Sequence, residues 1–154
     1  MATFSAQYTT VRDAPAVDYR NEGAGTAGLK RGQIAKVVAG LIVPWAAAAD
    51  VNLVVLAQDA SGVAGTPIAY YQLTSASRFE MTLEGVALVG DVSGTQVDLV
   101  SAGAGLPVIA ARTTVTPRVE ILETRIPLGT QNGITGDTRI RVLVKPLNIQ
   151  ANWA

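Results

Sequence analysis

The residues of this chain that could do chemistry are few and unfavourably spaced. One literal motif is present, a G-x-G-x-x-G run at 23–28, with Asp50 placed 22 positions after its last glycine. In a dinucleotide site such glycines follow a buried strand and open a helix whose N-terminus holds the pyrophosphate. Here residues 16–22 are too polar for a central strand. Gly32 would interrupt the helix, and Pro44 would interrupt the strand that should follow it. We therefore interpret the glycine run as a hinge and expect no bound cofactor.

The carboxylates do not have the spacing of an acid–base pair. If Glu80 and Glu84 share a strand face, a rise of about 3.3 Å per residue places them roughly 13 Å apart, beyond the window of about 5–9.5 Å used by glycosidases. Glu120 and Glu123 point to opposite faces of a regular strand. The chain also has no His and no Cys, which excludes Ser-His-Asp catalysis, thiol catalysis and thiolate metal sites. We expect no enzymatic activity.

A metal ion would have to be held by carboxylate and carbonyl oxygens alone, which favours calcium or magnesium. The two loops that could supply such oxygens, at 59–62 and 132–137, contain too few acidic residues. No metal site is predicted.

The composition favours strands over helices. The chain of 154 residues contains 19 Val, 9 Ile and 15 Thr, with 15 Gly and 7 Pro recurring at short intervals. β-Branched side chains pack well on a pleated surface, whereas Gly and Pro break helices. Apolar runs between turn signals occur at 33–43, 51–57, 68–74, 79–89, 96–100, 108–114, 118–126 and 139–147. This spacing predicts an all-β domain over residues 29–154, a small β-barrel or β-sandwich, with at most one short helix at Trp45–Asp50.

Two of these runs alternate between apolar and polar residues. In residues 78–84 the alternation predicts a core face of Phe79, Met81 and Leu83, and an acidic outer face that includes Glu80 and Glu84. In residues 139–145 it predicts an inward apolar face and an outer basic face of Arg139, Arg141 and Lys145. The basic face lacks interleaved aromatic residues, so we expect partner contact or solvation rather than nucleic-acid binding.

Residues 1–28 differ from the rest because small and polar residues dominate and no apolar period persists. We expect an extended N-terminal arm that a partner surface or another copy of the chain orders. Its aromatic residues Phe4, Tyr8 and Tyr19 are the predicted partner contacts, and removal of the arm should abolish binding while the domain stays folded. The longest apolar stretch, at 37–49, is shorter than the roughly 20 residues of a membrane-spanning helix. With no signal-like N-terminus, we expect synthesis in a cytosol and no membrane partner.

Charge is balanced overall but unevenly placed along the chain. Residues 1–36 carry five basic and three acidic groups, residues 50–98 one and six, and residues 112–145 six and three. Segregated charge on a neutral chain suits self-association or docking on a mixed surface, whereas nucleic-acid binding calls for a net basic field.

A resemblance to a known class of proteins lies in residues 29–62. The segments Leu29-Lys-Arg-Gly-Gln-Ile-Ala-Lys-Val-Val-Ala-Gly-Leu-Ile-Val-Pro44 and Val51-Asn-Leu-Val-Val-Leu-Ala-Gln-Asp-Ala-Ser-Gly62 resemble small β-rich head decoration and stabilising proteins of tailed bacteriophages. Those proteins carry a Lys-Gly strand start, an Ala-rich turn and a Val-Leu-Ala-x-Asp-Ala strand end. In this chain Arg31 precedes Gly32, where a Lys is more usual.

The resemblance implies a viral structural protein, a capsid decoration or cement protein that binds the outside of an icosahedral head. Such a protein bridges subunits of the major capsid protein, typically as a homotrimer at threefold sites, with its arm laid across neighbouring subunits. Its place would be the capsid exterior of the virion, after synthesis in the host cytoplasm. Two alternatives remain open: another virion component, such as a tail or head-completion protein, and a glycan-binding β-sandwich module.

Overall fold

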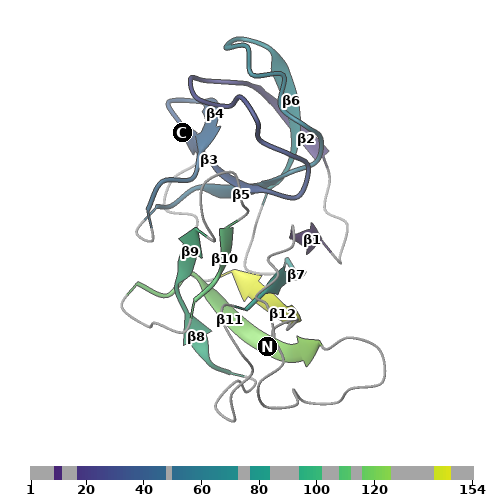
Figure 1. Cartoon of the computed structure of the whole chain (residues 1–154), viewed down its shortest axis with the longest axis vertical. Helices are drawn as coiled ribbons and strands as arrows, with labels where there is room; N and C mark the ends of the chain where they lie inside the picture. Colours follow the sequence, from purple (N-terminus) through teal and green to yellow (C-terminus); the bar gives the residue numbers. More distant parts are fainter. Residues whose placement is uncertain are drawn as a thin grey trace, which may run out of the picture.

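The computed structural model describes residues 9–11, 17–47, 50–72, 77–83, 94–101, 108–111, 116–125 and 141–146. Within these residues the chain forms β-strands and no helix, which confirms the predicted all-β fold. The described part of Trp45–Asp50, where at most one short helix was expected, is a loop. The strands form two layers, drawn one above the other in Figure 1.

The lower layer contains a five-stranded sheet and a two-stranded sheet. The five-stranded sheet has the order β1-β7-β12-β11-β8, and the small sheet pairs β9 with β10. All of these pairs are antiparallel. The strands are β1 (Thr10–Val11), β7 (Phe79–Thr82), β12 (Arg141–Pro146), β11 (Val119–Arg125), β8 (Gln96–Val97), β9 (Leu99–Ser101) and β10 (Val108–Ala110).

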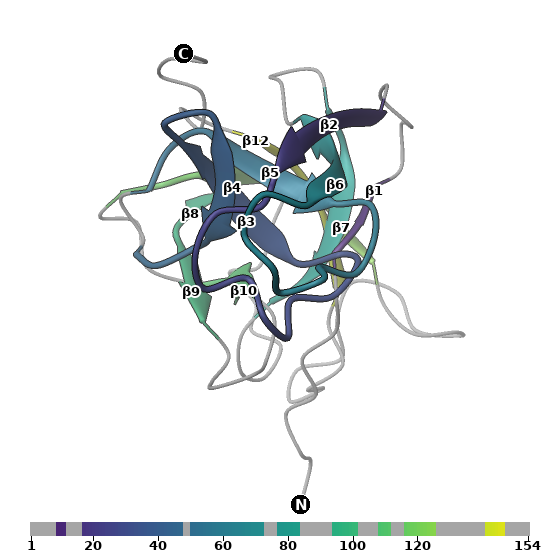
Figure 2. The same ribbon diagram turned by 90° about the horizontal axis from the view of Figure 1, so that it is seen from above.

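The upper layer is one five-stranded antiparallel sheet with the order β2-β6-β5-β3-β4. Its strands are β2 (Val17–Asn21), β6 (Pro67–Gln72), β5 (Leu53–Leu56), β3 (Ile34–Val38) and β4 (Leu41–Pro44). Figures 1 and 2 together show β2 and β6 on the same side of the molecule as β1 and β7, with β8 and β9 on the opposite side.

The edge strands of the upper sheet meet at one end. Glu22, directly after β2, forms an isolated parallel bridge with Ile42 of β4, and the Gly23 backbone N–H donates to the Ile42 carbonyl over 2.7 Å. The sheet therefore curls, but among the described residues no sheet closes into a barrel. Of the two predicted architectures, the sandwich-like one fits the structure.

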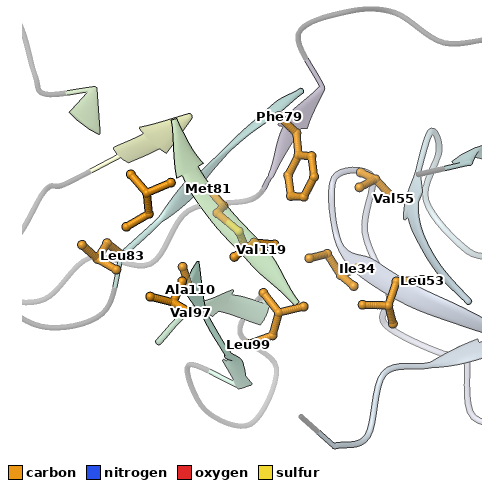
Figure 3. Packing of buried hydrophobic residues seen from close by; sticks show 11 residues of the cluster. Ile34, Leu53, Val55, Phe79, Met81, Leu83, Val97, Leu99, Ala110 and Val119 are labelled. Atoms are coloured by element: carbon orange, nitrogen blue, oxygen red, sulfur yellow. The ribbon is translucent and has the colours of Figure 1, made fainter. Parts of the chain in front are cut away.

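The middle of the upper sheet is buried on both faces, as β5 shows. All of its side chains are buried, yet they alternate between two cores. Leu53 and Val55 point to the core between the layers, where they meet Phe79 and Met81 of the lower sheet (Figure 3). Val54 and Leu56 point to a second core on the other face of the upper sheet. Because β5 is central and covered on both sides, its sequence is continuously apolar rather than alternating.

Residues 9–28 belong to the folded domain wherever the structure describes them, which differs from the arm that the composition of residues 1–28 predicts. Thr10–Val11 pair with β7, and β2 pairs along its whole length with β6. The apolar signal was missing because β2 is an edge strand with mostly exposed side chains. Removal of residues 1–28 is therefore expected to destabilise the domain, since it deletes two paired strands.

The alternation in residues 78–84 predicts the core face correctly and the opposite face incorrectly. Phe79, Met81 and Leu83 are buried. Glu80 is buried as well, at 7% exposure, so the prediction of an outer acidic face is wrong for this residue; Glu84 lies outside the described residues. Period-2 alternation reveals the polarity of each strand face but not what covers it, and β7 lies inside its sheet between β1 and β12.

Candidate functional site

The carboxylate of Glu22 is the centre of the most buried polar network in the described part of the chain. Its side chain is 1% exposed, at the point where β2 ends. Oε1 accepts hydrogen bonds from Thr26 Oγ1 at 2.6 Å and from the Gly62 backbone N–H at 3.0 Å. Oε2 accepts from the Ser61 hydroxyl at 2.7 Å and from the Ser61 backbone N–H at 2.9 Å. One side chain thus joins the end of β2 to the glycine run and to the loop between β5 and β6.

Burial by itself raises the pKa of Glu22, but the hydrogen bonds from Thr26, Ser61 and Gly62 outweigh it, and the pKa is lowered from its ordinary value. All of these donors favour the ionised carboxylate. The group is therefore an anion at neutral pH with its acceptor sites occupied by the protein. Its role in this geometry is to hold segments together.

The glycines at 23–28 allow the chain to turn and to pass close to strand β4. A Cβ at Gly23 would lie 2.7 Å from Val43 Cγ1, which no real side chain tolerates. Gly25 and Gly28 have φ of 82° and 85°, in the left-handed region that favours glycine. Turns follow the run in place of a helix, so the segment lacks the helix N-terminus on which a pyrophosphate would sit.

Asp50 is the centre of a second network, which reaches both layers. Its Oδ1 accepts from Lys36 Nζ at 3.0 Å, and its Oδ2 accepts from the backbone N–H groups of Ala46 and Ala47 at 2.7 and 2.9 Å. The Asp50 carbonyl accepts from Arg118 Nε at 3.0 Å, just before β11 of the lower sheet. Burial acts to raise the pKa of Asp50, but the two backbone bonds and Lys36 lower it below its ordinary value.

Four exposed apolar side chains lie on the upper sheet, near the place where its edges meet. By strand register they are on the same face as Ile34 and Tyr71, the face that the lower layer covers elsewhere. They are Val17 and Tyr19 on β2, Val38 at the end of β3, and Leu41 at the start of β4; we call them the apolar strip. Tyr19 is the most exposed of them, at 66%. Arg20, the neighbour of Tyr19, points the other way and donates from Nε to the Tyr70 hydroxyl and from Nη1 to the Gly40 carbonyl.

This arrangement brings β2 next to the β3–β4 turn. Since β2 and β4 run side by side from the Glu22–Ile42 bridge, Tyr19 lies close to the level of that turn. Val38 and Leu41 are directly opposite each other in the β3–β4 pair and so share one face. The strip is therefore a local apolar surface from strands that are separated in sequence.

The predicted contact residues are only partly placed by the structure. Tyr19 is on the exposed edge strand, within the apolar strip. Phe4, Tyr8 and Arg139 lie outside the described residues. Arg141 and Lys145 are on β12, the middle strand of the lower five-stranded sheet, where their backbone partners on β11 are Arg125 and Glu120.

Neither carboxylate network was predicted from the sequence. The partners of Glu22 on the β5–β6 loop are 39 and 40 positions away in sequence, so no local spacing signals the contact. Among the described residues, no group of three or more His, Cys, Asp or Glu side chains could hold a metal ion. Nor does any helix in this described part have the length and apolarity needed to cross a membrane.

A scan against protein-family models, a search of curated proteins and a search of solved structures find no match to this chain.

Proposed function

We propose that this chain is a viral structural protein that decorates the outer surface of an icosahedral phage head and stabilises the head by bridging subunits of the major capsid protein. In this proposal its partners are the major capsid protein and further copies of the chain in a homotrimer. It acts on the exterior of the virion after synthesis in the host cytoplasm. The similarity of residues 29–62 to head decoration proteins is the reason for choosing a virion.

The apolar strip is the observation that carries the proposal. Apolar side chains gathered on one surface, unlike exposed apolar residues scattered singly, are typical of an interaction site. Tyrosine is also enriched at protein–protein interfaces because its large ring is apolar while its hydroxyl can still bond to water or a partner. Tyr19 combines both properties on an edge strand.

The buried carboxylates support a mechanical role rather than a chemical one. Glu22 ties three segments of the upper layer, and the Asp50–Arg118 bond ties the two layers. A rigid body binds a repeated surface with little loss of internal freedom on binding. When several copies engage the shell together, weak single contacts add up to a strong attachment.

Co-sedimentation of the purified chain with empty phage heads tests this function. We expect the unaltered protein to pellet with the heads and to raise their midpoint of thermal disruption. Tyr19→Ser should weaken attachment by about tenfold or more, because removing a central aromatic residue from an interface costs on the order of 2 kcal/mol.

The matched control is Val63→Ser, which removes a similarly exposed apolar side chain from the β5–β6 loop, outside the strip. It should bind heads as the unaltered protein does. Failure of the unaltered protein to bind empty phage heads would reject the proposal. Equal losses for both variants would reject the strip as the contact surface. Rings of five, six or twelve copies would indicate a tail or head-completion component instead.

A further inference from the structure

A hollow of about 360 Å³ opens between β1 and the upper sheet. It is lined by Thr9 and Val11 on one side, by Arg31 and Gly32 on another, and by Tyr71 together with β5. Figure 1 shows β1 at the rim of the lower layer, facing the upper one. The volume lies near the lower end of the range of about 300–1,000 Å³ that ligand pockets occupy. Such a hollow accepts one or two amino-acid side chains rather than a large cofactor.

One of the residues that line the hollow has an unsatisfied polar atom. Thr9 is 4% exposed, and its hydroxyl oxygen has no hydrogen-bond partner among the described residues. Its backbone N–H, by contrast, donates to the Gly32 carbonyl at 2.9 Å, which fixes the residue in place. A buried hydroxyl without a partner is costly, but this oxygen has almost no accessible surface, so a ligand in the hollow does not reach it.

A cationic side chain, that of Arg31, lines the same hollow. The Arg31 backbone N–H donates to Asp59 Oδ1 at 2.8 Å, but within the described ranges its guanidinium has no ion pair or hydrogen bond. The Asp59 carboxylate forms its ion pair with Lys30 instead, at 3.8 Å. The hollow thus combines apolar walls from Val11 and Tyr71 with a free guanidinium, a group that recognises carboxylates.

We propose that this hollow binds an extended peptide segment of a partner protein, in which an apolar side chain lies next to a carboxylate. The apolar side chain packs against Val11 and Tyr71, and the carboxylate pairs with Arg31. That the partner is the shell subunit rests on the function proposed above. The binding chemistry does not depend on it.

Titration of the isolated, isotope-labelled protein by NMR tests the proposal without any phage head. The probes are N-acetyl-L-leucine, which carries a carboxylate beside an apolar side chain, and N-acetyl-L-leucinamide, its neutral counterpart. We expect saturable shifts at the amides of Val11, Gly32 and Tyr71 with the acid. The neutral probe should bind about tenfold more weakly, because a hydrogen bond to a charged group is lost. Equal binding of both probes, or no saturable shift at these amides, would overturn the proposal.

Arg31 and its neighbour Lys30 provide a matched pair of variants for this titration. Arg31→Gln should reduce binding of N-acetyl-L-leucine about tenfold, whereas Lys30→Gln, which changes the same charge beside the hollow, should leave it within about twofold. Equal losses in the two variants would mean that the probe senses general charge, which contradicts a site. Both side chains are exposed, so neither variant endangers folding.

A further measurement tests the peptide character of the ligand. A capped Leu-Asp-Ala tripeptide should bind more tightly than N-acetyl-L-leucine. If it binds more weakly, the site takes a free small carboxylate and the peptide proposal is wrong. If the protein does not bind heads in the co-sedimentation assay, the proposed function fails, but the binding measured by NMR should be unchanged.

Discussion

Replacement of Glu22 by Gln isolates what a buried carboxylate without a cationic partner contributes to this fold. The substitution preserves size but turns one acceptor oxygen into an NH₂ group. Whichever way the amide is oriented, the NH₂ faces a hydroxyl and a backbone N–H, either those of Thr26 and Gly62 or both from Ser61. The hydroxyl can rotate to accept a bond, but the backbone N–H cannot.

The expected cost follows from that unpaired N–H. One buried donor without a partner costs about 1–3 kcal/mol, and the remaining bonds lose the additional strength that the negative charge gives them. We expect Glu22→Gln to lower the free energy of unfolding by about 2–4 kcal/mol at pH 7. Urea denaturation followed by circular dichroism measures this, with Asp18→Asn as the control. Asp18 is exposed on the neighbouring strand β2, and its replacement should cost less than about 0.5 kcal/mol.

The pH dependence of this difference supplies a second check. Because the pKa of Glu22 is lowered on folding, its contribution is complete above the ordinary value of 4.5 and is lost as the pH falls through the lower folded pKa. The difference between the two proteins should therefore shrink under acid conditions. A loss below about 0.5 kcal/mol at pH 7, or a loss that is the same in acid, would refute the reasoning.

Three other substitutions test separate parts of the account by the same denaturation assay. Asp50→Asn should cost about 1–3 kcal/mol, since it breaks the Lys36 ion pair and can leave a backbone N–H unpaired. Because the pKa of Asp50 is lowered on folding, this cost should fade in acid. A cost that persists in acid would contradict the role of the charge. Ala39→Asn should raise the free energy of unfolding by up to about 1 kcal/mol. The reason is that Ala39 has φ of 49° in a two-residue hairpin turn, where Asn is favoured. A decrease would show that Ala39 is not strained in this turn. Gly23→Ala should cost about 1–3 kcal/mol, because its Cβ would lie 2.7 Å from a Val43 methyl group. The cost should be smaller in a Val43→Ala background, which lacks that methyl group, and an equal cost in both backgrounds would contradict the packing argument.

The sequence was informative where burial leaves a pattern. Runs of apolar residues predicted β3, β5, β6, β7 and β11, because these strands contribute to one or both cores, and the run at 139–147 coincides with β12. The run at 33–43 concealed a hairpin, since the turn consists of Ala39 and Gly40 and only the glycine is a turn signal. The edge strand β2 gave no signal, because an exposed strand does not need an apolar face.

The candidate site was harder to predict for a physical reason. Tyr19 could be selected from the sequence because a large aromatic residue in a polar segment is unusual. Its neighbours in the apolar strip could not, since Val38 and Leu41 belong to an apolar run that predicts buried side chains. Whether a residue is exposed at a strand end depends on how the sheet curls, and that depends on the long-range Glu22–Ile42 bridge.

Electron cryo-microscopy of empty phage heads incubated with this chain tests the central claim most directly. A difference map between decorated and bare heads should show trimeric density on the outer surface at threefold positions, with the β2 and β3–β4 edge of each copy against the shell. Density confined to the interior or to the tail vertex, or no added density at saturating protein, would contradict the account.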